Sequence, residues 1–119
     1  MSMHDVCRKA LLSSRSLFVA FLDKGGMELC AEGVAAESDR VWLRNCIAEL
    51  VRRAPDGIGS AVDRREFGAL TNSGQLTHGL QVLFVSVSGR ALVALFDART
   101  SGGLVRMRLT EAAAALMDY

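Results

Sequence analysis

The 119-residue sequence has few of the features that assign a chain to a specialised class of protein. It contains one proline and no low-complexity tract, and half of its residues are apolar, which excludes a disordered chain. Its longest apolar stretches are about seven residues, against the roughly 20 that cross a bilayer, and its first residues lack the apolar region of a signal peptide. We therefore expect a single soluble domain over residues 1–119, without a membrane span, in the cytoplasm.

An excess of charge of one sign is also missing. The 14 basic and 13 acidic residues alternate in sign along the chain and leave a net charge of +1. A nucleic-acid-binding domain usually gathers a basic excess on one face, so we expect no nucleic-acid partner. Cysteine is scarce too: Cys7, Cys30 and Cys46 are odd in number and have no close spacing, which does not indicate a disulfide framework.

Motifs for catalysis and metal binding are absent as well. There is no GxSxG motif, and the spacing of the carboxylates suggests no catalytic pair. His4 and Cys7 lie three positions apart, so they share a face of a predicted helix, but Cys30, Cys46 and His78 are scattered singly and the paired spacing of a zinc site is missing. We expect no catalytic residue, no metal, no cofactor and no enzymatic activity.

Three helices are predicted from apolar residues at helical spacing. They cover His4–Leu12, Glu37–Ala54 and Thr100–Met117, with Ser101 as the cap of the last one. The middle helix has a stripe that includes Leu43, Cys46, Ile47, Leu50, Val51 and Ala54. Trp42 lies beside this stripe, so the apolar arc is wider than one core contact requires.

Five strands are predicted from short apolar runs bounded by turn residues. They are Ser16–Leu22, Met27–Ala31, Glu66–Thr71, Leu80–Val87 and Arg90–Asp97. The order α-β-β-α-β-β-β-α describes an α/β (α+β) fold with a five-stranded, mainly antiparallel sheet. Since several strands are apolar on both sides, helices are expected on both faces of the sheet. Three short helices cover two faces thinly, which favours a second copy of the chain as additional cover.

Two segments carry a resemblance to a known family. The segment Ala91–Leu116, ALVALFDARTSGGLVRMRLTEAAAAL, has an apolar strand, a polar link and then Gly103-Leu104-Val105-Arg106 opening an alanine-rich helix. The first predicted hairpin, SLFVAFLDKGGMELCAEG, has an apolar strand, an Asp, glycines and a returning strand. Both segments and the order of elements resemble the Roadblock / dynein light chain family, in particular bacterial members that regulate gliding GTPases.

The resemblance implies a non-enzymatic regulatory or scaffold protein. Members of the family form dimers through the middle helix and the edge strand after it, and many bind small Ras-like GTPases. The implied interface of this chain consists of Trp42, Leu43, Cys46, Leu50 and Phe67.

Three alternatives stay open at this point. Trp42 is either an interface anchor or a residue at the rim of the monomer core. The charged pair Arg64 and Arg65 either contacts a partner or protects a strand edge from unwanted pairing. The whole domain is either the regulatory protein described above or a ligand-sensing domain with a pocket between the sheet and its helices.

Overall fold

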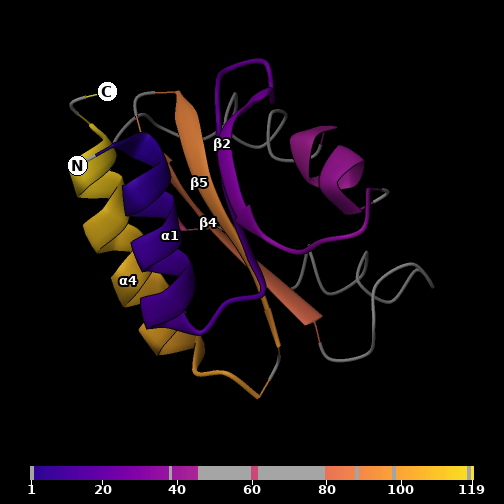
Figure 1. The fold of residues 1–119 in the computed structure, drawn as a ribbon, viewed down its shortest axis with the longest axis vertical. Helices are drawn as coiled ribbons and strands as arrows, with labels where there is room; N and C mark the ends of the chain where they lie inside the picture. The colour runs from indigo at the N-terminus through magenta and orange to yellow at the C-terminus, as the bar shows by residue number, and fades with distance from the viewer. Residues whose placement is uncertain are drawn as a thin grey trace.

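The computed structural model describes residues 2–37, 39–45, 60–61, 80–87, 89–97, 99–117 and 119 (Figure 1). Its named elements are α1 (Met3–Ser14), β1 (Phe18–Leu22), β2 (Glu28–Gly33), β3 (Ser60–Ala61), β4 (Leu80–Val87), β5 (Arg90–Asp97) and α4 (Gly102–Leu116). Residues 39–45 are also helical and are called helix 39–45 below. They form the described part of the predicted middle helix, whose residues 46–54 lie outside the described ranges.

Both terminal helices begin at serine caps. The Ser2 hydroxyl accepts a hydrogen bond from the Asp5 backbone N–H at 3.1 Å, and the Asp5 carboxylate accepts one from the Ser2 N–H, so the two residues form a capping box. The Ser101 hydroxyl accepts from the Leu104 N–H at 3.2 Å, as the sequence predicted. These caps satisfy backbone donors that the first turn of each helix leaves free.

The sheet is antiparallel at every pairing and has the order β2-β1-β5-β4-β3. The two predicted hairpins, β1–β2 and β4–β5, are confirmed. Gly89, with a φ of 81°, lies in the short link between β4 and β5. β1 also pairs with β5, which places the first strand of the chain beside the last one.

The expectation of five full strands was wrong. Among the described residues, four strands have at least five residues, whereas β3 has two, which pair with Ser86 and Val85 of β4. The predicted strand Glu66–Thr71 lies outside the described residues. Ser60 and Ala61 are small and lack the β-branched or aromatic side chains by which a strand is recognised in a sequence, so this short pairing gave no signal.

Each face of the sheet carries its own apolar cluster, because alternate residues of a strand point to opposite sides. On one face, Val19 and Phe21 of β1 pack with residues of α1 and α4, and these two helices lie side by side (Figure 1). On the opposite face, Phe18, Ala20 and Leu22 pack with Leu43 of helix 39–45. Helices on both faces are therefore confirmed. Within the described ranges, no helix combines the length and the apolar character needed to cross a membrane.

Candidate protein-interaction surface

Helix 39–45 packs on the face of the sheet opposite to α1 and α4. Leu43 is 3% exposed and belongs to the cluster that Phe18, Val93 and Leu95 form on this face. Trp42 is partly buried and packs against the same cluster. Val41 and Asn45, four positions apart, are exposed on the outer side of the helix. The helix thus has one side fixed on the sheet and another side available for contact.

An ion pair joins this helix to the edge strand β2. The Arg40 guanidinium donates from Nε to Glu28 Oε2 at 3.1 Å and from Nη2 to Glu28 Oε1, a bidentate arrangement. The guanidinium also lies 5.2 Å from the centre of the Phe18 ring. The hydrogen bonds from Arg40 to Glu28 raise the pKa of Arg40, which keeps the group charged. Glu28 is therefore a structural partner of the helix rather than a free acidic group.

A bulge in β2 makes this pairing possible. In the β1–β2 ladder, Phe21 pairs with Cys30 but Leu22 pairs with Glu28, so Leu29 is an extra residue. Directly paired residues of an antiparallel ladder point to the same side. Glu28 therefore faces helix 39–45 with Leu22, while Cys30 faces α1 with Phe21, although Glu28 and Cys30 are only two positions apart.

The predicted interface is only partly within the described residues. Trp42 and Leu43 lie together against the second face of the sheet, as set out above. Leu43 is covered within its own chain, and Trp42 is partly exposed. The remaining predicted interface residues, Cys46, Leu50 and Phe67, and the predicted partner contacts Arg64 and Arg65, lie outside the described ranges.

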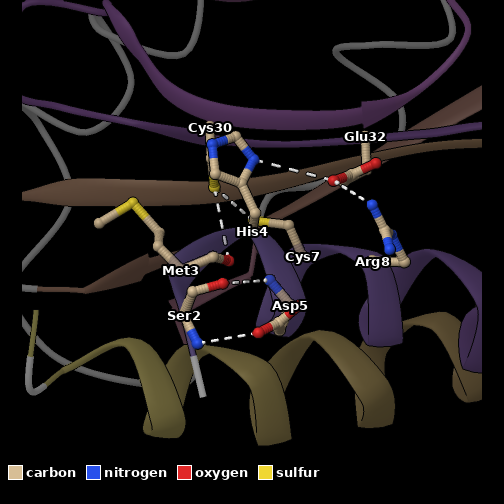
Figure 2. Close-up of polar contacts among 8 residues, drawn as sticks. All are labelled: Ser2, Met3, His4, Asp5, Cys7, Arg8, Cys30 and Glu32. Atoms are coloured by element: carbon tan, nitrogen blue, oxygen red, sulfur yellow. Dashed lines mark hydrogen bonds and ion pairs between the residues drawn. The ribbon is translucent and has the colours of Figure 1, made fainter.

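The structure brings together two cysteines that the sequence left apart. Cys7 of α1 and Cys30 of β2 are 23 positions apart in the chain, and their Sγ atoms lie 2.6 Å from each other (Figure 2). Both residues are buried, with exposed fractions of 0% and 4%, and both are free thiols. The Sγ atom of Cys30 also lies 3.8 Å from the Met3 carbonyl oxygen.

The contact between the two thiols shifts the pKa of each of them. The hydrogen-bond contact with Cys30 and burial both raise the pKa of the Cys7 thiol. The same contact lowers the pKa of the Cys30 thiol, since it stabilises a thiolate there. Glu32 lies near the pair, and its Oε1 atom is 3.8 Å from His4 Nδ1 and 3.7 Å from Arg8 Nη2 (Figure 2). Both of these partners are exposed side chains of α1.

The described residues offer no cluster for a metal ion, and their hollows differ in size. Among them, no group of three or more His, Cys, Asp and Glu side chains could hold a metal. A cavity of about 90 Å³ lies between α1 and α4, lined by residues that include Lys9, Ser13 and Arg108. This cavity is smaller than the roughly 300 Å³ of sites for drug-sized ligands. Two more open hollows are larger: one of about 470 Å³ lies on α1, and one of about 600 Å³ lies where β5 leads into α4, with Asp97, Arg99 and Leu104 in its lining. His78 lies outside the described ranges.

Comparisons with known proteins identify the fold. No model of a protein family matches the chain, and no curated protein matches it either. Among solved structures, MglB of Myxococcus xanthus is 22% identical, with a TM-score of 0.69 over 98% of this chain and 92% of that one. A Roadblock/LC7 domain from Streptomyces avermitilis is 9% identical, with a TM-score of 0.69 over 100% and 98% of the two chains. The chain therefore has a Roadblock-like fold, as its sequence resemblance implied.

A third similar structure belongs to a protein of a different kind. LokiProfilin1, solved in complex with rabbit actin, is 18% identical, with a TM-score of 0.65 over 99% of this chain and 97% of that one. At such identities a likeness establishes the fold alone.

Proposed function

We propose that this chain is a non-enzymatic regulatory or scaffold protein of Roadblock type, a single domain over residues 1–119 that acts in the cytoplasm. It pairs with a second copy of itself and binds a small Ras-like GTPase or a larger protein assembly. The observation that carries this proposal is the likeness in fold to MglB, which extends over nearly the whole chain. The resemblance of Ala91–Leu116 to the Roadblock family supports the same conclusion, since this segment forms β5 and α4.

The proposed pairing surface is the outer side of helix 39–45, which is fixed on the sheet beneath it. Leu43 and the Arg40–Glu28 ion pair fix the helix on the sheet, so that its outer side is presented in one orientation. A rigid, partly apolar helix face suits an interface, because little side-chain freedom is lost on binding. We propose that Trp42 anchors this interface, with Leu43 supporting it from beneath and Cys46, Leu50 and Phe67 extending it.

The partner surface is proposed at Arg64 and Arg65. Arginine is the preferred cation at protein interfaces, because its planar guanidinium forms bidentate hydrogen bonds with carboxylates. Charges at the rim of an interface mainly accelerate association and make it sensitive to salt. The two arginines would therefore help to steer a GTPase with an acidic surface onto the paired chains.

Binding to a purified small Ras-like GTPase tests the proposal. The GTPase is loaded with GDP or with a non-hydrolysable GTP analogue, and its affinity for the chain is measured by calorimetry at two salt concentrations. We expect binding that depends on the nucleotide. Replacing Arg64 and Arg65 together by Ala should weaken it by about tenfold, mostly through slower association at low salt. GTP hydrolysis with and without the chain then separates a regulator from a scaffold.

Two controls make the experiment decisive. Arg106→Ala removes a charge from the exposed side of α4 and should leave the affinity unchanged. Rabbit actin is the comparison ligand, because LokiProfilin1 shares this fold. Binding to actin but not to the GTPase in either nucleotide state would overturn the proposed partner.

A further inference from the structure

The contact between Cys7 and Cys30 has no role in the proposed function. The two residues come from separate elements, α1 and β2, whose relative position is set by the apolar cluster around Val6, Val19 and Phe21. Their Sγ atoms, 2.6 Å apart, are closer than two nonbonded sulfur atoms normally approach. A disulfide requires a separation of about 2.0 Å, so a small further movement would bring the two atoms to bonding distance.

We propose that Cys7 and Cys30 form a reversible disulfide that joins α1 to the edge strand β2. The fold also holds the reduced pair, since both cysteines are free thiols in this structure and the Cys30 sulfur lies 3.8 Å from the Met3 carbonyl oxygen. Oxidation removes only weak sulfur hydrogen bonds, which makes both states compatible with the same packing. The pair is thus a modification site within a chain whose fold does not depend on the bond.

The oxidant is a low-molecular-weight disulfide of the glutathione class. The Cys30 thiolate attacks one sulfur of this reagent, whose S–S bond breaks, and the released thiolate takes up a proton. The Cys7 sulfur, after losing its proton, then attacks the mixed disulfide on Cys30 and releases the second small thiol. Two protein thiols are oxidised and one small disulfide is reduced to two thiols, so atoms and electrons balance.

The order of these steps follows from the environment of the pair. Cys30 lies on the edge strand β2 and is 4% exposed, against 0% for Cys7, and its thiol is the one whose pKa is lowered, so Cys30 is the attacking group and Cys7 the resolving one. Because both residues are buried, the reagent reaches them only when α1 separates locally from β2. The reaction is therefore expected to be slower than that of an exposed thiol.

The test equilibrates the full chain in glutathione buffers of graded redox ratio, followed by acid quenching and alkylation. Intact mass should show the loss of two hydrogens without a retained glutathione, and peptide mapping should link Cys7 to Cys30. Because the bond closes a loop between residues 23 positions apart, the thermal midpoint of the oxidised chain should exceed that of the reduced chain by on the order of 10 °C. Dithiothreitol should reverse both effects.

Variants assign the effect to this pair. Cys7→Ala and Cys30→Ala should each abolish the thermal shift, whereas Cys46→Ala should retain it. Far-UV circular dichroism checks that the variants are folded. If a variant does not fold, the peptide map of the unaltered chain shows whether Cys7 is linked to Cys30. Three alkylatable thiols at the most oxidising ratio, a linkage through Cys46, or a linked chain without a higher midpoint would each overturn the proposal.

Discussion

At the scale of the residue, Gly33 shows how one position can be restricted by backbone alone. It ends β2 with a φ of 94°, a left-handed conformation that residues with a side chain rarely adopt. A Cβ atom built on it would lie 2.2 Å from the Leu17 carbonyl oxygen, which itself accepts a hydrogen bond from the Val34 N–H at 2.9 Å. The chain can leave the edge strand at this point only because no side chain is present.

The first prediction concerns this glycine. Gly33→Ala should lower the free energy of unfolding by at least about 2 kcal/mol, because it combines an unfavourable φ with a backbone clash. Urea denaturation followed by circular dichroism measures the loss.

Gly103 provides a control of opposite sign. It lies in the first turn of α4, where a Cβ atom would meet only the Ser101 hydroxyl oxygen at 3.7 Å. Gly103→Ala should raise stability by about 0.5 to 1 kcal/mol, because alanine favours the helix. Equal effects of the two substitutions would contradict the role given to Gly33.

At the scale of the element, β2 connects two layers of the fold. The bulge at Leu29 lets the strand present Glu28 to helix 39–45 on one face and Cys30 to α1 on the other. An edge strand of regular alternation would have directed both residues to the same side. This single irregularity therefore allows both the ion pair with Arg40 and the close approach of the two thiols.

The second prediction tests the ion pair as the attachment of helix 39–45. Glu28→Gln should lower the free energy of unfolding by about 0.5 to 1 kcal/mol, because the Arg40 side chain is only 33% exposed and would lose its charged partner. Thermal and urea denaturation measure the change.

Glu37→Gln is the matched control for Glu28→Gln. Glu37 lies 3.6 Å from Arg44, and its side chain is 74% exposed, so this pair should contribute no measurable stability. If Glu37→Gln destabilised the chain as much as Glu28→Gln, the attachment of the helix would not depend on the Arg40–Glu28 pair.

At the scale of the whole molecule, the described helices are distributed unequally over the two faces of the sheet. α1 and α4, from distant parts of the sequence, together cover one face. On the other face, helix 39–45 is the described helical cover for a cluster that spans β1, β4 and β5. In the proposed pairing, a second copy of the chain binds on the side with helix 39–45.

The third prediction is the mass in solution. Light scattering at micromolar concentration should give about twice 12.8 kDa, and Leu50→Asp should reduce it to the mass of one chain, since a charge is unfavourable in an apolar interface. Leu12→Asp is the control, because Leu12 is 70% exposed on α1, which covers the opposite face. A mass of one chain for the unaltered protein, or a dimer that survives Leu50→Asp, would count against the proposed pairing.

The sequence by itself determined the local elements and their sides. The apolar runs of Phe18–Leu22 and Arg90–Asp97, the helical spacing in α1 and α4, and the Ser101 cap depend on neighbouring residues, so local patterns were enough to predict them. The family resemblance supplied the Roadblock-like fold as a whole. The two-residue β3 was missed because so short a pairing leaves no pattern in the sequence.

Only the tertiary structure decided which distant residues meet. The pairing of β1 with β5, the Cys7–Cys30 contact and the Arg40–Glu28 ion pair each join positions far apart in the chain, and no local spacing encodes them. The bulge at Leu29 reverses the alternation of β2, so counting residues would have placed Glu28 and Cys30 on one face. The physical reason is that such contacts result from packing layers against each other, whereas periodicity reports only which side of its own element a residue occupies.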